Sequence, residues 1–137
     1  MSRGLFLKLL LLDSLFACAL VAGALAYHGH VHPVAAVAVA VVLAAFAAGA
    51  GVCLWLAWTD KRGRVLNDVG ELAELLPGLA LLGTTAGFLI ALSGDSGDVQ
   101  HRIAGAATGI VSTFVGIACW LVLSAQYRLL SRHAEEA

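Results

Sequence analysis

Charged residues are scarce in this chain, and that scarcity decides its class. Only 12% of the 137 residues are charged, whereas 61% are hydrophobic and the mean hydropathy is +0.92. A water-soluble domain of this length has too much surface for its volume to bury so many apolar side chains. The net charge of -1 gives no basic surface for binding nucleic acid. The composition therefore predicts an integral membrane protein.

Cysteine and proline are also rare, with three and two residues respectively. Cys18, Cys53 and Cys119 fall in separate apolar runs, and their odd number and wide spacing fit neither a disulfide framework nor a metal motif. We interpret them as small buried apolar residues. No nucleophile, base and orienting group occur together at a usable spacing, so the sequence indicates neither an enzyme nor a cofactor site.

Four hydrophobic runs are long enough to cross a bilayer with an apolar core about 30 Å thick. The first run resembles a signal peptide, with basic residues before a leucine-rich core, but we interpret it as a retained helix. We therefore predict an all-α membrane protein with a single domain over residues 1–137. Its four transmembrane helices are expected at about 5–27, 34–58, 68–92 and 99–131.

The third and fourth predicted helices carry distinctive end signals. Asp68 and Glu71 match a capping box, which would start the third helix as a short amphipathic lead-in. Pro77 should interrupt that lead-in before the membrane-embedded part, because proline lacks a backbone N–H. The fourth helix is longer than a bilayer requires, so its C-terminal end should project beyond the membrane surface.

The basic residues predict the orientation of the helices in the membrane. With the predicted helix order, all but Arg102 fall at one surface: Arg3, Lys8, Lys61, Arg62, Arg64, Arg128 and Arg132. The tendency of basic residues to remain in the cytoplasm then places both termini and the middle loop on the cytoplasmic side.

Two polar features stand outside this pattern. Asp13 interrupts the first apolar run, and intramembrane acids are candidate functional residues. Because Asp13 lies only about two helical turns after Leu5, we favour a local hydrogen bond or a cation near the membrane surface.

His28, His30 and His32 alternate in the first loop, and imidazole suits zinc, copper or nickel. No carboxylate or cysteine lies nearby, so we favour an exposed loop over a metal site.

Small residues recur at helical spacing along the third and fourth runs. Each run has a stripe at positions i, i+4 and i+8, formed by Gly83, Gly87 and Ala91 and by Gly105, Gly109 and Thr113. In a bilayer such stripes let helix backbones approach closely and let hydroxyls bond across helices. One protomer need not use both stripes completely, so we expect part of them to join copies of the chain.

Two longer patterns extend over residues 77–127. The first reads P-G-L-A-L-L-G-T-T-A-G at 77–87, and the second reads G-I-V-S-T-F-V-G at 109–116, with Tyr127 eleven residues later. Together they resemble the pore-lining helices of the MotA/TolQ/ExbB proton-channel family, the membrane subunits of ion-driven motors. The family patterns read P-x-L-G-L-L-G-T-x-x-G and A-x-x-x-T-x-x-G, so Ala80 and Gly109 replace a glycine and an alanine.

This resemblance implies a proton-channel-forming subunit in the bacterial inner membrane. Five copies would form a ring around two single-helix partner subunits, each of which supplies an intramembrane aspartate. Thr84 and Thr113 match the threonines of the family's ion path, and we include Thr85 and Thr108 as further candidates. The implied helix-packing residues are Pro77, Gly83, Gly87, Gly105, Gly109, Gly116 and Tyr127.

The chain departs from the family in three ways. Thr108 stands where the TolQ and ExbB branch usually has a glutamate, and Val122 stands where many members have a proline. The segment between the second and third helices is short, whereas family members carry a large cytoplasmic domain there, so contact with a flagellar rotor is not expected. Neither pore helix has an acid within 77–92 or 103–125, and hydroxyls alone can only support water. The carboxylate for proton transfer then has to come from the partner.

Two other functions remain open at this stage. A non-conducting membrane scaffold or assembly subunit would use the same helix packing without carrying ions. A small four-helix drug transporter would use Asp13 as its coupling acid, but that residue lies near one membrane surface rather than at the midplane, where such sites occur. We rank the transporter last.

The predicted orientation can be tested by cysteine labelling in intact cells. Cysteines introduced at Gly29 and Gly97 should react with a membrane-impermeant thiol reagent added outside, whereas a cysteine at Gly63 should not, because the basic middle loop stays in the cytoplasm. Labelling of Gly63→Cys from outside would reverse the orientation.

Overall fold

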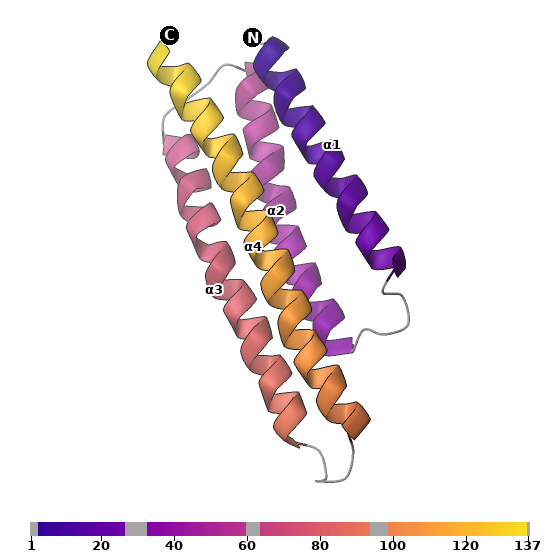
Figure 1. The fold of residues 1–137 in the computed structure, drawn as a ribbon. Helices are drawn as coiled ribbons and strands as arrows, with labels where there is room; N and C mark the ends of the chain where they lie inside the picture. Colours follow the sequence, from indigo (N-terminus) through magenta and orange to yellow (C-terminus); the bar gives the residue numbers. More distant parts are fainter. Residues whose placement is uncertain (1–2, 27–32, 60–63, 94–98, 137) are drawn as a thin grey trace.

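The structure is a computed structural model that describes residues 3–26, 33–59, 64–93 and 99–136. These residues form four helices, α1 (Arg3–Ala26), α2 (Pro33–Thr59), α3 (Arg64–Ser93) and α4 (Val99–Glu136). Consecutive helices run in opposite directions, so both termini lie at the same end of the bundle (Figure 1). The prediction of an all-α chain is confirmed for the described residues, and each helix is long and apolar enough to cross a membrane.

Helix α3 differs most from its prediction. It begins at Arg64, so Asp68 and Glu71 lie inside the helix and do not cap its start. It also continues through Pro77, and the predicted interruption is wrong. Pro77 is exposed, while Leu76 and Ala80 on either side of it are buried in the bundle. This packing holds both halves of α3 in line although the proline removes one backbone hydrogen bond.

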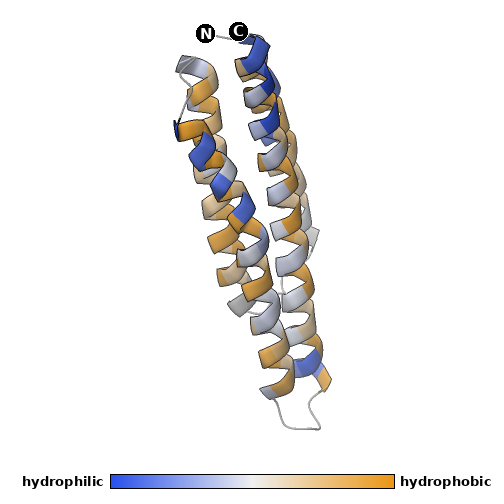
Figure 2. Ribbon diagram, turned by 90° about the vertical axis from the view of Figure 1, so that its left-hand side faces the viewer, coloured by the Kyte–Doolittle hydropathy of each residue, from blue (hydrophilic) through white to orange (hydrophobic). Residues whose placement is uncertain are grey.

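The other helix ends lie close to the predicted ones, except at the end of α4. That helix reaches Glu136 and has 38 residues, which corresponds to about 57 Å at 1.5 Å per residue. A bilayer core of about 30 Å leaves a substantial part of α4 outside it. Hydrophilic residues gather mainly in the half of the bundle that holds both termini (Figure 2).

The closest helix contact joins α3 to α4 through glycine. A Cβ atom added at Gly87 would lie 2.5 Å from the backbone nitrogen of Gly109, and one at Gly105 would lie 2.4 Å from the backbone nitrogen of Ala91. Neither position has room for a side chain. A Cβ atom added at Gly116 would lie 2.1 Å from the Cβ of Ala80. The small-residue stripes therefore pack α3 against α4 within one chain.

Helix α2 closes the bundle against this pair, and α1 is attached along its first half. The ring of Phe6 packs edge-on against Trp58 with the centroids 5.3 Å apart, and Phe16 packs in the same way against Phe46 at 4.9 Å. Beyond these contacts α1 diverges from the other helices (Figure 1). Edge-to-face aromatic pairs contribute about 0.5–1.5 kcal/mol each beyond the burial of their area, so they are a substantial part of the α1 attachment.

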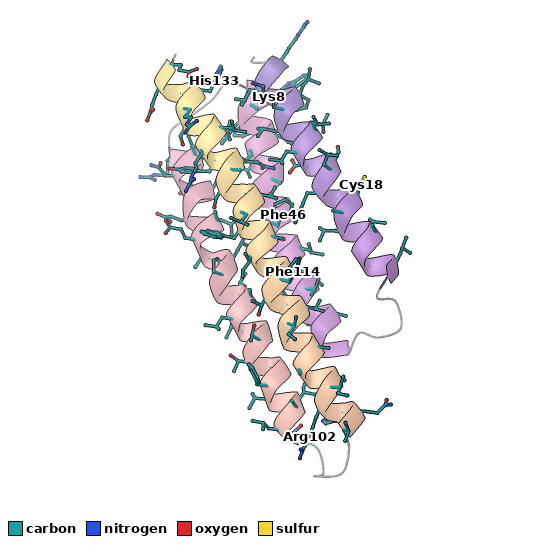
Figure 3. All side chains as sticks on the ribbon, viewed as in Figure 1. Lys8, Cys18, Phe46, Arg102, Phe114 and His133 are labelled. Atoms are coloured by element: carbon teal, nitrogen blue, oxygen red, sulfur yellow. The ribbon has the colours of Figure 1, made fainter. Side chains whose placement is uncertain are left out.

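The cysteines follow the same division between core and periphery. Cys53 and Cys119 are buried, as predicted, but Cys18 is exposed on the outer side of α1 and points away from the bundle (Figure 3). The prediction that all three are buried is wrong for Cys18, because it lies on the side of α1 that no other described helix covers.

The described basic residues segregate between the two ends of the bundle. Lys8 and His133 lie at the end that holds the termini, and Arg102 lies at the other end (Figure 3). Arg3, Arg64, Arg128 and Arg132 belong to helix segments at the end with the termini. Lys61, Arg62 and the three histidines of the first loop lie outside the described residues. The segregation agrees with the charge pattern used to predict the orientation, which itself stays a prediction.

Replacing Gly87 by alanine should separate α3 from α4, because its Cβ would meet backbone atoms that cannot rotate away. We expect a loss of about 1–3 kcal/mol in the free energy of unfolding in mild detergent, as for an overpacked core. The matched control is Gly78→Ala on the same helix, where an added Cβ meets no atom within 4 Å. That variant should be neutral or slightly stabilised. Equal stability of the two variants would contradict the backbone-to-backbone contact.

Candidate functional site

Thr84 and Thr113 meet at the contact between α3 and α4. Their hydroxyl groups are hydrogen-bonded to one another. The Thr113 hydroxyl also lies 2.9 Å from the carbonyl oxygen of Gly109, and the Thr84 hydroxyl lies 3.0 Å from the carbonyl oxygen of Ala80. A helical threonine commonly donates to the carbonyl four residues earlier. Each hydroxyl has one proton, so one threonine can donate across to the other while the second donates to the carbonyl oxygen of its own helix.

Gly109 makes this arrangement possible. Its position lies against the Thr84 backbone, where an added Cβ would be 3.3 Å from the Thr84 carbonyl oxygen. The Gly109 carbonyl oxygen lies 3.4 Å from the Thr84 hydroxyl as well as accepting from Thr113. A larger residue at 109 would hold the two helices further apart and would separate the hydroxyls.

An open groove of about 350 Å³ runs over the two threonines. Apart from the two hydroxyls, its walls are backbone and apolar side chains. The lining residues are Thr84, Phe88, Gly105, Ala106, Gly109, Ile110, Thr113, Phe114 and Ile117. Phe114 is 75% exposed and Ile110 is 69% exposed, so these large apolar side chains of the groove wall are mostly uncovered by the described residues. The groove is an apolar surface with one polar position.

The hydrogen bonds determine what that polar position can bind. Each threonine has one hydroxyl proton, and each proton has an acceptor on the two helices, either a backbone carbonyl oxygen or the other hydroxyl. Only lone pairs on the hydroxyl oxygens then remain to accept a hydrogen bond from a ligand. The site as folded therefore offers acceptors, and it suits a donor such as water or a neutral carboxylic acid.

The other two candidate ion-path residues lie elsewhere. Thr85 is exposed, donates to the Leu81 carbonyl oxygen at 2.9 Å, and does not line the groove. Thr108 is only 1% exposed and donates to the Ala104 carbonyl oxygen at 2.8 Å. Thr108 lies five residues before Thr113, which rotates it by about 140° around α4 at 3.6 residues per turn, so it faces the bundle interior and not the groove.

The remaining packing candidates lie along the same two helices. Gly83 faces Ser112, whose buried hydroxyl lies 3.4 Å from the Ala80 carbonyl oxygen. Tyr127 covers Gly70, where an added Cβ would lie 3.1 Å from the tyrosine ring. Ser112 was not among the sequence candidates, although it continues the small-residue stripe three residues after Gly109.

Sequence reasoning also missed Gln126, which binds Asp13. The Gln126 amide nitrogen on α4 donates to one carboxyl oxygen of Asp13 on α1, and the Gln126 side chain is fully buried. Asp13 was expected to bond locally or to meet a cation, and its hydrogen bond instead joins two helices. A single amide inside an otherwise apolar run was the signal that could have found this pair.

No metal centre emerges from the part of the chain that the structure describes, where no three potential metal ligands come together. His28, His30 and His32 lie outside those residues. Comparisons with protein-family models, with curated proteins and with solved structures gave no match.

The two threonines should be coupled energetically. Thr84→Val and Thr113→Val each remove one side of the shared hydrogen bond, so their effects on the free energy of unfolding should not add. We expect a coupling of about 0.6 kcal/mol, within an upper limit of about 1.7 kcal/mol for such bonds between membrane helices. Thr85→Val is the control, because Thr85 bonds only to its own helix and should combine additively with Thr113→Val. Additivity in both cycles would mean that the two hydroxyls do not interact.

Proposed function

We propose that this chain is the channel-forming subunit of an ion-driven or other energy-transducing complex, and that it lies in the bacterial inner membrane with both termini in the cytoplasm. The observation that carries the proposal is the Thr84–Thr113 pair in an open apolar groove between α3 and α4. The sequence resemblance to the MotA/TolQ/ExbB family supports it, because its two motifs supply these two threonines and the glycines that bring them together.

The proposed occupant of the groove is a transmembrane helix of a partner subunit that carries an intramembrane aspartate. The apolar walls suit the body of such a helix, and the threonine oxygens suit one polar group on it. A neutral carboxylic acid can donate to these oxygens without disturbing the existing bonds. An ionised carboxylate finds a donor only if a threonine hydroxyl leaves its carbonyl acceptor, so the site favours the protonated partner.

The proton would then move with the partner's carboxyl group. Contact with the threonine pair stabilises the neutral acid, and separation from the pair removes that stabilisation. The apolar parts of α3 and α4 carry no acid of their own between 77 and 92 or between 103 and 125. The partner therefore supplies the titratable group, and this chain supplies the surface that favours one of its charge states.

A ring of five copies around two partner helices is part of the proposal. Because the glycines pack α3 against α4 within the chain, we expect contacts between copies to use large apolar side chains on the outer faces. Many of these are exposed, including Leu7, Leu11 and Leu15 on one side of α1. In a membrane the same side chains also suit lipid, so they permit a ring without requiring one.

A non-conducting scaffold is the second candidate, and one observation favours it. Both hydroxyl protons of the threonine pair are already bound within the chain, and the surrounding groove is apolar. A helix can pack against such a surface without a chain of water molecules being bound there. The scaffold and the channel then differ in whether removal of a hydroxyl changes ion flux.

Proton flux should decide between these two functions. The chain is co-expressed with any single-helix membrane protein that a neighbouring reading frame encodes, and flux is compared with that of Thr84→Val and Thr113→Val. In the channel, valine at either position keeps the shape but removes the hydroxyl, so flux should fall strongly while assembly survives. Serine at either position keeps the hydroxyl and should retain most of the flux.

Thr85→Val serves as the matched control, because that hydroxyl lies outside the groove and should not affect flux. Equal flux in the valine and serine variants would assign the threonine pair to packing and would favour the scaffold. Absence of flux with every partner would do the same.

A further inference from the structure

Asp13 and Gln126 form a polar contact between α1 and α4. Asp13 lies within α1 and Gln126 within α4, and both helices are candidate membrane spans. Asp13 is the one acid of the described chain that is not exposed, since the acidic residues of α3 and of the α4 end all are. It therefore requires a different explanation from the solvated acids.

The pair has two buried atoms without partners. The Gln126 amide nitrogen donates to Oδ1 of Asp13, while Oδ2 of Asp13 and Oε1 of Gln126 have no hydrogen-bond partner among the described residues. Both atoms are almost completely inaccessible. With Asp13 ionised, Oδ2 of its carboxylate and Oε1 of the Gln126 amide are both acceptors, so the arrangement would leave two buried acceptors and one negative charge unsatisfied. Such groups are costly in an apolar environment.

One proton satisfies both atoms. If the proton resides on Oδ2, that oxygen becomes a donor and can bond to Oε1 of Gln126, while the amide nitrogen keeps its bond to Oδ1. The carboxylic acid and the amide then form a closed pair with two hydrogen bonds and no net charge. We propose that Asp13 is a proton-binding site, held as a neutral acid by Gln126 between α1 and α4.

Among the described residues, no positively charged group is placed to favour the ionised form. On α1 itself the nearest base is Lys8, which is exposed five residues earlier. On α2 the buried Cys53 thiol lies within electrostatic range of Asp13, and it carries no positive charge. On α4 the facing group is the neutral Gln126, and α3 makes no contact with α1. A proton is therefore the available means of removing the charge.

The proton also controls how firmly α1 is attached. Besides this pair, the attachment includes apolar contacts near its start and the edge-on rings of Phe6 and Phe16. Loss of the proton would place a charge inside that apolar contact and weaken it, because an ionised carboxyl group would draw α1 towards the aqueous end of the bundle. Docking of α1 thus depends on protonation of Asp13. Protonation of Asp13 requires neither a partner subunit nor a ring, so it is independent of the proposed channel.

Infrared spectroscopy of the protein in lipid vesicles tests the protonation directly. A carboxylic acid C=O band at neutral pH is assigned to Asp13 by comparison with the Asp13→Asn variant. We expect this band to be present in the unmodified protein and absent in Asp13→Asn. In Gln126→Leu, which removes the bonding partner, the band should shift or disappear. Absence of an Asp13 band at neutral pH would overturn the proposal, as would a carboxylate band of Asp13 that changes when sodium replaces potassium.

A distance measurement tests the docking of α1. Spin labels are placed on the exposed Cys18 of α1 and on Arg128→Cys, an exposed position of α4, while the buried Cys53 and Cys119 remain unlabelled. The distance distribution should broaden to longer values at alkaline pH in the unmodified protein. It should stay narrow in Asp13→Asn, whose amide preserves the pairing with Gln126 and cannot lose a proton in this range. An equal response of both proteins to pH would contradict the docking role.

Discussion

The close approach of α3 and α4 is the constraint on which the rest of the structure depends. At Gly87, Gly105 and Gly109 the two backbones touch without intervening side chains. In a bilayer lipid tails are as apolar as side chains, so helix association there relies on van der Waals contact and on hydrogen bonds between helices. The glycines provide the contact, and the contact brings Thr84 within reach of Thr113. The candidate site is therefore a product of the packing.

Much of this architecture follows from spacing alone. Hydrophobic runs of membrane length predicted four helices. The small-residue stripes that contain Gly87 and Gly105 marked the surfaces at which α3 and α4 pack closely. Boundaries were less predictable, since α3 begins before its capping pattern and passes through Pro77. Local end signals describe what a segment prefers by itself, and burial of residues on both sides of the proline decided the outcome.

Side-chain partners were the part that spacing could not supply. Thr108 and Thr113 both lie within residues 77–127, the segment that resembles the family. Only the rotation of α4 against its neighbours places Thr113 in the groove and Thr108 in the interior. Gln126 and Asp13 are more than a hundred positions apart in the chain, and no periodic pattern links them. Their pairing depends on how α1 lies against α4, which is a property of the folded bundle.

The glycine contact also has a mechanical consequence. Flexible side chains between two helices act as a soft layer that can rearrange when one helix moves, and α3 and α4 have no such layer around Gly87 and Gly105. Helices α3 and α4 should therefore move together as one rigid unit. A displacement of the groove wall would then be transmitted along α4 with little loss, as far as the segment that extends towards Glu136.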